Sequence, residues 1–512
     1  MTLENLLDAA RANASDVSAL EALASFALTH QQEHRALGVL EDGVKRHKNS
    51  ALLWQWLALL QRATDDRVSA VDAFAKAAVL APNDATIAKG RAQTLLEAGL
   101  PAVDAFATAR KLTPNDGDIV LGVTAALFAE GQAETALSIL AGSVSANPLW
   151  LYGHRDLVQL RWMMGEGSAS FASLRQATAT NPESETLWAQ LIHALMQAGL
   201  NEEALAAIAD GRKAIGESPR FVINEAVIRS DAGDRAAAAR LFGGFEDGDD
   251  PTVAVRIIRH HLRYGDLTAA TRLIDLWIGR PGEALVWPYA SLCWRLLGDA
   301  RADWLEGEAA LVRVFDLAAK LPPLDRLAEL LRGLHVARSQ HLDQSVRGGT
   351  QTDGALFARI EPEIRQLRAA IAGAVAEYVA GLPPRDAAHP TLGPQRDPPV
   401  RFAGSWSVRL AGNGFHANHV HPAGWISSAL YVALPERGPA DGANAGWLAL
   451  RAPEAGLGLD LPPEQLIEPK PGRLVMFPST MWHGTLPFEA GERLTVAFDV
   501  APPMASASAE IT

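Results

Sequence analysis

The sequence predicts a multidomain α + β protein, in which an all-α array of helix pairs precedes an antiparallel β domain with flanking helices. Two observations lead to this class. Residues 1 to about 320 are rich in alanine and leucine, and prolines recur in them at a nearly constant interval. From residue 402 onward, short apolar runs alternate with glycine and proline turns. We therefore expect two domains, residues 1–318 and 319–512.

Composition limits the function classes. The 512 residues are enough for about two to four domains. The formal net charge of −13 argues against nucleic-acid binding, which needs a basic face. The single cysteine, Cys293, excludes an internal disulfide and a cysteine-rich zinc site. The N-terminus has no leader pattern and no long apolar run exists, so we expect a cytoplasmic protein without a membrane span.

The helical array is predicted from a repeated motif. The segment 70-AVDAFAKAAVLAPND-84 aligns with 102-AVDAFATARKLTPND-116, and Pro82, Pro114, Pro148 and Pro182 follow at intervals of 32, 34 and 34 residues. Small residues seven positions apart allow two antiparallel helices to approach closely, and each proline ends a helix pair. This stretch resembles the tetratricopeptide repeat family, which implies a solenoid that binds a peptide or protein partner in its groove. The alternative is an array that only scaffolds or dimerises the chain.

Residues 319–400 predict helix and loop. The segment 344-QSVRGGTQTDG-354 is polar and is expected to form a turn. An amphipathic helix is expected over residues 355–380, followed by a loop over the proline-rich residues 381–400. Five strands are then expected, over residues 404–410, 426–434, 446–452, 472–478 and 493–500, which together indicate a sandwich or barrel.

Three histidines occur within 413-NGFHANHVHPAGW-425. Because side chains two apart in a strand share a face, His419 and His421 point the same way. His483 follows a later strand, and ten residues on, Arg493 and Thr495 share one face of the last strand. A buried arginine needs an anionic partner. The pattern therefore predicts a metal site beside an anion-binding residue.

These residues resemble the double-stranded β-helix of the Fe(II)- and 2-oxoglutarate-dependent oxygenases. The resemblance rests on 419-HVHPAGWISSALYVALP-435 and 471-PGRLVMFPSTMWHGT-485, and it is closest to a bacterial and phage group that carries H-x-H. It implies that His419, His421 and His483 bind Fe(II). It also implies that Arg493 and Thr495 bind the far carboxylate of 2-oxoglutarate, which reacts with dioxygen.

The motif differs from most of the superfamily at one position, where His421 replaces the usual Asp or Glu. Three neutral imidazoles would leave the Fe(II) site with a charge of +2, so we expect weaker metal retention; His421 lying beside the metal without binding it is the alternative. Tyr431 is a further candidate to bind 2-oxoglutarate. Residues expected around the site, next to the substrate or the metal ligands, are His416, Trp425, Trp482, Arg347 and Gln351.

The leading hypothesis is a 2-oxoglutarate-dependent dioxygenase that hydroxylates a peptide or protein recruited by the repeats. The alternatives are a cupin-type metalloenzyme that does not use 2-oxoglutarate, and a non-catalytic repeat adaptor. A cupin does not require Arg493 and Thr495, and it usually adds a glutamate shortly after H-x-H, which 422-PAGWISS-428 lacks. The sequence leaves open the substrate, the oligomeric state and the role of residues 344–354.

Overall fold

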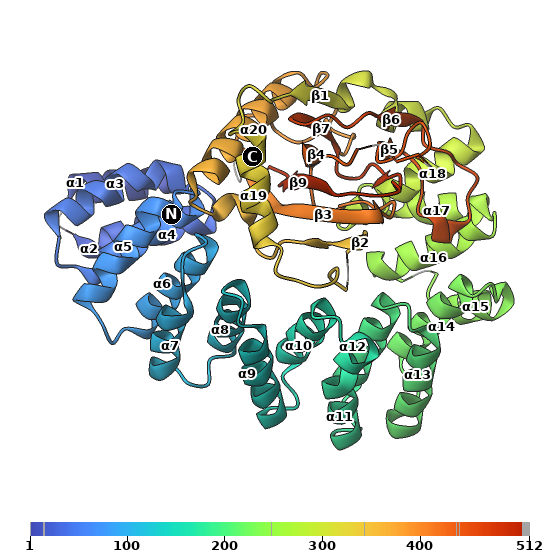
Figure 1. Ribbon diagram of the computed structural model, residues 1–512, viewed down its shortest axis with the longest axis horizontal. Coiled ribbons are helices and arrows are strands. Elements are labelled where there is room, and N and C mark those ends of the chain that lie inside the picture. The colour runs from blue at the N-terminus through green and yellow to red at the C-terminus, as the bar shows by residue number, and fades with distance from the viewer. Residues whose placement is uncertain are drawn as a thin grey trace. The chain divides into compact units, whose positions relative to one another are not determined.

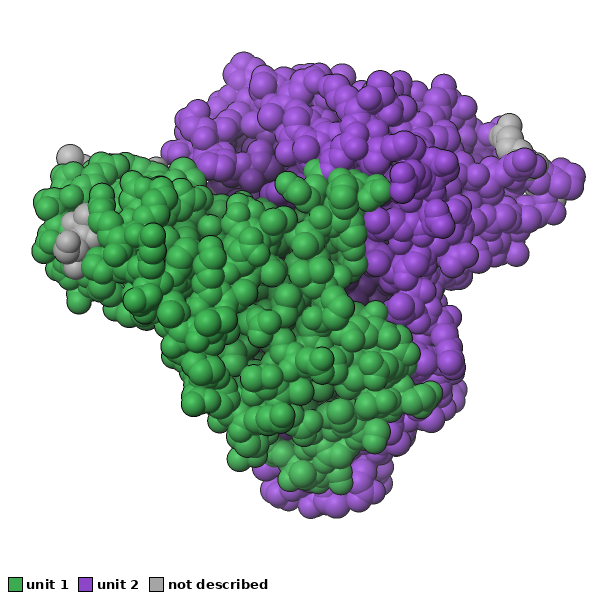
Figure 2. All heavy atoms as spheres, turned by 60° about the vertical axis from the view of Figure 1, so that its left-hand side comes forward, with its two compact units in different colours: residues 1–147, 354–365 green, residues 148–353, 366–512 purple. Residues whose placement is uncertain are grey.

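The computed structural model describes residues 2–13, 16–246, 248–342, 344–436, 438–439 and 441–503. The chain forms two compact units, coloured separately in Figure 2. The first unit comprises residues 1–147 and 354–365, and the second comprises residues 148–353 and 366–512. Each unit is described by itself.

The first unit contains helices α1 to α9, which pack as successive neighbours along the chain (Figure 1). Their bounds are α1 Leu3–Ala12, α2 Val17–Thr29, α3 Glu33–Arg46, α4 Ala51–Ala63, α5 Arg67–Leu80, α6 Ala85–Glu97, α7 Val103–Leu112, α8 Gly117–Ala129 and α9 Ala133–Ala146. The predicted helix-pair array is confirmed.

The repeated motif accounts for these helix ends and contacts. Pro82 lies between α5 and α6, and the Asp84 carboxylate caps α6 by accepting hydrogen bonds from the N–H groups of Thr86 and Ile87 at 2.9 and 3.0 Å. Phe74 is fully buried, and its ring packs so closely on Gly90 that a Cβ there would lie 2.6 Å from the ring. The large residue of each repeat is thus held between small residues of its neighbours.

The second unit begins with nine more α-helices of the described chain and continues into the sheets. Their bounds are α10 Leu151–Met163, α11 Ala172–Thr180, α12 Glu185–Gln197, α13 Asn201–Ile215, α14 Pro219–Asp231, α15 Arg235–Phe242, α16 Pro251–Arg263, α17 Leu267–Trp277 and α18 Trp287–Leu297. Cys293 is a buried free cysteine. No helix in the described residues has both the length and the apolar character that a membrane crossing requires.

Two antiparallel sheets follow, as predicted for a jelly-roll domain (Figure 1). One sheet has the order β1-β7-β4-β9-β3-β2 and the other has the order β6-β5-β8. The strands are β1 Arg313–Asp316, β2 Val346–Gln351, β3 Phe402–His416, β4 Ile426–Ala433, β5 Leu448–Leu450, β6 Gln465–Ile467, β7 Arg473–Pro478, β8 His483–Thr485 and β9 Arg493–Val500. Helices α19 Leu324–Leu334 and α20 Pro362–Ala380 flank the sheets, and the Tyr378 hydroxyl of α20 donates to Leu311 O at 2.7 Å.

The polar segment 344–354 differs from its prediction. Residues 346–351 form edge strand β2, which pairs with β3, instead of a turn. The glycines do not break the strand because the register shifts between Arg347 and Gly349, and Gly348 adopts a φ of +70° within that irregularity. The expected helix over residues 355–380 is also shorter: it begins at Pro362, after a 3-10 turn at Leu356–Ala358.

Candidate metal centre

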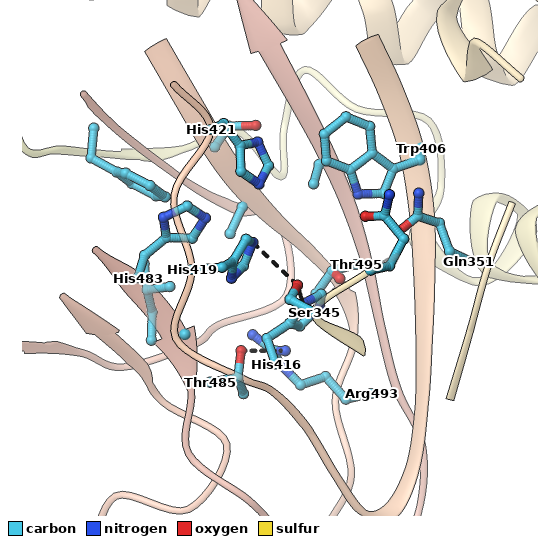
Figure 3. Close-up of a pocket in the computed structure, with 17 residues that line it drawn as sticks. Ser345, Gln351, Trp406, His416, His419, His421, His483, Thr485, Arg493 and Thr495 are labelled. Carbon is cyan, nitrogen blue, oxygen red and sulfur yellow. Dashed lines mark hydrogen bonds between the residues drawn. The ribbon is translucent and has the colours of Figure 1, made fainter. Parts of the chain in front are cut away.

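Three histidine side chains converge in the second unit (Figure 3). One ring nitrogen from each of His419, His421 and His483 lies within 4.8 Å of the others. A β-bridge produces this convergence, because His419 N–H donates to His483 O at 2.9 Å and His483 N–H donates to His419 O at 3.0 Å. His421 N–H is fixed to Ser479 O at 2.8 Å. The structure thus brings together the three residues predicted as ligands.

Each imidazole is oriented by a contact of its Nδ1 atom. His419 Nδ1 lies 2.8 Å from Ala417 O, and His483 Nδ1 lies 2.9 Å from Met481 O. His421 Nδ1 lies 2.6 Å from a carboxylate oxygen of Asp499. An Nδ1–H donated to oxygen leaves Nε2 as the lone-pair atom, which is the arrangement found behind metal-bound histidines.

Burial favours the neutral, metal-binding form of two rings. It lowers the pKa of His419 to about 3 and holds the pKa of His483 well below its ordinary value. Neighbouring imidazoles contribute in the same direction, since each disfavours a second positive charge. A site of three neutral nitrogen ligands suits Fe(II), Mn(II) or Zn(II).

Asp499 is a site residue that the sequence reasoning missed. Its second carboxylate oxygen accepts a hydrogen bond from the Ser427 hydroxyl at 2.6 Å, and the Ser427 oxygen lies 3.0 Å from that of Ser479. The strand pattern contained the signal, because Asp499 shares the parity of Arg493, Thr495 and Ala497 in β9. Its carboxylate supplies, behind His421, the negative charge that the H-x-H motif lacks.

A buried cation faces the same cavity. Arg493 is 2% exposed, and its guanidinium donates to Thr485 Oγ1 at 3.0 Å and lies 5.1 Å from the Tyr431 ring centre. Its Nε atom is buried without a hydrogen-bond partner, and no carboxylate of the described residues pairs with it. Burial consequently lowers the pKa of Arg493. An anionic ligand would relieve this cost, so the residues present fit a dicarboxylate cosubstrate.

The cavity is lined by both polar and apolar side chains. It is lined by Gln344, Ser345, Gln351, Trp406, His416, His419, His421, Ser428, Ala429, Leu448, Phe477, His483, Gly484, Thr485, Arg493, Thr495 and Ala497. Of the residues predicted around the site, Thr495, His416 and Gln351 line this cavity. Trp406 and Thr485 were not anticipated from the sequence, because no motif marks them.

Four other candidates are not among the residues that line this cavity. Tyr431 is in the core beneath Arg493 and does not line the cavity. The Trp425 indole donates to Thr391 O at 2.8 Å and the Trp482 indole donates to Pro288 O at 2.9 Å, so both tryptophans are packing residues and not walls of the cavity. Arg347 is exposed and lines a second cavity.

Comparison with known proteins agrees with this geometry. Residues 404–499 match the family model described as "Putative 2OG-Fe(II) oxygenase", a range that holds all three histidines and Arg493. The β domain is thus similar to 2-oxoglutarate-dependent oxygenases. Residues 149–218, which include α10 to α13, match a second model described as "Bacterial transcriptional activator domain". No curated protein matches the chain.

Solved structures, among them tetratricopeptide repeat proteins, resemble the N-terminal helical region. YrrB, described as a TPR protein with an unusual peptide-binding site, is 18% identical, covers 38% of this chain and 98% of its own, and has a TM-score of 0.30. A tetratricopeptide repeat protein from Parabacteroides merdae is 15% identical, with coverage of 46% and 94% and a TM-score of 0.30. Yeast Tom70 is 13% identical, with coverage of 54% and 60% and a TM-score of 0.35.

Proposed function

We propose that this chain is an Fe(II)- and 2-oxoglutarate-dependent oxygenase that hydroxylates a peptide or protein segment. In this proposal residues 319–512 carry the reaction and the repeats within residues 1–318 recruit the substrate. The observation that carries the cosubstrate assignment is the buried, unpaired Arg493 in the cavity that also holds the three histidines.

Each residue has a defined task in this proposal. His419, His421 and His483 would hold the metal through Nε2, and Asp499 would keep His421 in the required tautomer. Arg493, Thr485 and Thr495 would bind the far carboxylate and so orient the cosubstrate. Bound Fe(II) and 2-oxoglutarate supply dioxygen activation: one oxygen atom enters a substrate C–H bond and the other enters succinate, with release of CO2.

The cavity also supports water exclusion around the reacting centre. Phe477, Leu448 and Ala497 line it with apolar surface, whereas Trp406 lies beside His421 with the ring centres 5.8 Å apart. Apolar walls strengthen the charge interactions of Arg493 and protect reactive species from side reactions.

The two alternatives explain less. A cupin-type metalloenzyme would use the histidines but would leave Arg493 buried without a partner. A non-catalytic adaptor would need neither the convergent Nε2 atoms nor the carboxylate behind His421. The distinction therefore rests on whether Arg493 binds 2-oxoglutarate.

Calorimetric titration of 2-oxoglutarate into the Mn(II)-loaded protein tests this point without requiring turnover. We expect Arg493→Ala to weaken binding at least about 30-fold, because a buried charge pair is lost. Arg409→Ala removes an arginine of β3 whose partner is Glu492 at 2.5 Å, and it is the matched control. Binding of 2-oxoglutarate that is equal in the wild type and Arg493→Ala would contradict the assignment, and tight metal binding without any 2-oxoglutarate binding would favour the cupin.

A further inference from the structure

A second, larger cavity lies beside the metal centre within the second unit. It has a volume of about 600 Å³ and opens at the C-terminal ends of α10, α12, α14 and α16. Its opposite wall is formed by residues 340–342, Arg347, Glu454 and Gly456. Figure 1 shows α10 and α12 below β2, the strand that begins at this wall. The cavity is therefore built by residues that are far apart in sequence, from both the helical array and the β domain.

Hydrogen bonds fix this wall to the helix ends. The N–H groups of Arg338 and Ser339 both donate to Met163 O, at 2.9 and 3.0 Å, and the Leu342 N–H donates to Gln159 Oε1 at 3.2 Å. The first two bonds satisfy the Met163 carbonyl, which the end of α10 leaves free, and the third goes to a side-chain amide. These hydrogen bonds hold the segment before β2 in place, so this wall of the cavity has a defined position.

The start of β2 joins the two cavities. The Ala417 N–H donates to Ser345 O at 3.0 Å, which extends the pairing of β2 with β3 by one residue. Residues two apart in a strand share a face and lie roughly 7 Å apart. Ser345 contacts His416 Nδ1 at 3.1 Å and His419 Nε2 at 3.2 Å, whereas Arg347 lines the second cavity. A chain lying along this face would pass from Arg347 to the metal centre.

Among the described residues of the cavity, the arginines Arg259 and Arg263 have acidic partners and Arg347 does not. Arg259 pairs with Glu454, and Arg263 pairs with Asp231 at 2.6 Å. Arg347 contacts only the backbone oxygens of Gln344 and Val346, at 2.7 and 2.8 Å, and has no acidic partner among the residues that the structure describes.

Three amide side chains of the cavity can also form hydrogen bonds with a ligand. The side chains of Gln197, Asn201 and Gln340 make no hydrogen bond to any described residue. Primary amides donate and accept, which suits both the N–H and the C=O groups of an extended backbone.

We propose that this second cavity holds an extended, acidic polypeptide segment, with a carboxylate of that segment paired to Arg347. This inference rests on the proposed function in one respect: the bound segment would be the part of the substrate that flanks the hydroxylated residue. The cavity would then select the substrate, and the held segment would present one of its side chains past Ser345 to the site formed by His419, His421 and His483.

Fluorescence anisotropy with the full-length protein tests the proposal, using labelled (Ser-Ala-Asp)4 as the probe. We expect (Ser-Ala-Asp)4 to bind at least about tenfold more tightly than (Ser-Ala-Asn)4, and Arg347→Glu to remove that preference. Asn201→Ala should weaken both peptides, because it removes an amide partner of the backbone. Arg240→Glu, which changes an exposed arginine of α15 outside the cavity, is the control.

Each other outcome overturns the inference. Equal affinity for the Asp and Asn peptides, or an Asp preference that survives Arg347→Glu, would show that Arg347 does not recognise a carboxylate. Tighter binding of single-stranded dT12 than of the acidic peptide would assign the cavity to nucleic acid. Calorimetry of 2-oxoglutarate on the wild type reports separately on the metal centre, so its failure would overturn the proposed function and leave the peptide result standing.

Discussion

His421 and Asp499 show at the scale of single residues how the site balances its charge. The 2.6 Å contact places a carboxylate directly behind an imidazole, so the negative charge lies one residue further from the metal position than in a site with an Asp ligand. Ser427 holds the other carboxylate oxygen at 2.6 Å and so fixes its orientation. We therefore expect metal retention to depend on Asp499, although it is not one of the three proposed ligands.

Asp499→Asn tests this dependence. Asparagine is nearly isosteric but neutral, and it can present its NH2 group to His421, which would favour the wrong tautomer. We expect the dissociation constant for Co(II) or Fe(II) to rise about 10- to 100-fold. Asp316→Asn, which alters an aspartate paired with Arg473 at 3.0 Å on β1, should leave metal affinity unchanged. Equal metal affinity in Asp499→Asn and wild type would show that the carboxylate is only structural.

Residue patterns predicted most of this site from sequence. Strand parity predicted that Arg493 and Thr495 share a face of β9, because alternation is a property of the backbone. The strand expected through His419 and His421 is not formed: both lie in the loop between β3 and β4, where His419 makes an isolated bridge to His483. Thr485 and Trp406 could not be found this way, since their positions depend on which strands become neighbours. The tryptophans flanking the motif, Trp425 and Trp482, illustrate the converse: closeness in sequence did not place either one at the cavity.

Among the secondary-structure elements, the short strand β8 brings His483 next to His419. His483 is its first residue, and the bridge to His419 crosses between β8 and the loop after β3. The next residue is Gly484, and a Cβ there would overlap Asn418 Oδ1 and lie 2.9 Å from His416 O. The absence of a side chain at this position lets the two histidine-bearing segments approach.

Gly484→Ala should therefore separate the ligands without unfolding the chain. We expect a loss of stability of about 1–3 kcal/mol and a clear weakening of metal binding, because the segment 416–418 must move away from β8. Gly373→Ala in α20, where a Cβ would meet nothing within 4 Å, is the matched control and should be neutral or slightly stabilising. Circular dichroism and metal titration measure the two effects; unchanged metal affinity in Gly484→Ala would contradict this account of the bridge.

The elements predicted well were those with strong local patterns. The strand expected over residues 493–500 has these bounds in the structure, and the loop over 381–400 contains no helix or strand. Strands β1, β6 and β8 were missed because each has only three or four residues. Strand β2 was missed because pairing with β3 outweighs the local preference of Gly348 and Gly349 for a turn.

At the scale of the whole molecule, the later helices and the sheets act as one unit. The Arg295 guanidinium of α18 lies 2.7 Å from the Glu464 carboxylate, and the Trp482 indole of the β domain packs edge-on against Tyr289. No pattern in the sequence predicts such contacts, because they join residues more than 150 positions apart. The domain boundary expected at residue 318 marks a change in sequence composition, and it stays a prediction.

Buried histidines make the stability of this unit depend on pH. His260 is 4% exposed within α16, its Nδ1 lies 2.9 Å from the Ser230 hydroxyl oxygen, and burial lowers its pKa from 6.5 to about 4. Because the folded pKa lies below the unfolded pKa, acid protonates the unfolded chain first. The stability contribution is present above pH 6.5 and is lost as the pH falls toward 4.

We expect His260 alone to account for a loss of about 2 kcal/mol between pH 7 and pH 5. The measurement is the urea midpoint at the two pH values, followed by far-ultraviolet circular dichroism. His260→Gln should reduce the drop in midpoint, whereas His34→Gln, at an exposed position of α3, should not. A drop that is identical in wild type and His260→Gln would show that other groups control the acid sensitivity.

The central claim is that the three histidines and Arg493 form one Fe(II) and 2-oxoglutarate site. Anaerobic titration of Fe(II) into the protein with 2-oxoglutarate, followed by visible absorption, tests it most directly. We expect a weak charge-transfer band from 2-oxoglutarate chelated on iron, which is lost in His421→Ala and strongly weakened in Arg493→Ala. Iron that binds to the wild type without producing this band would contradict the claim.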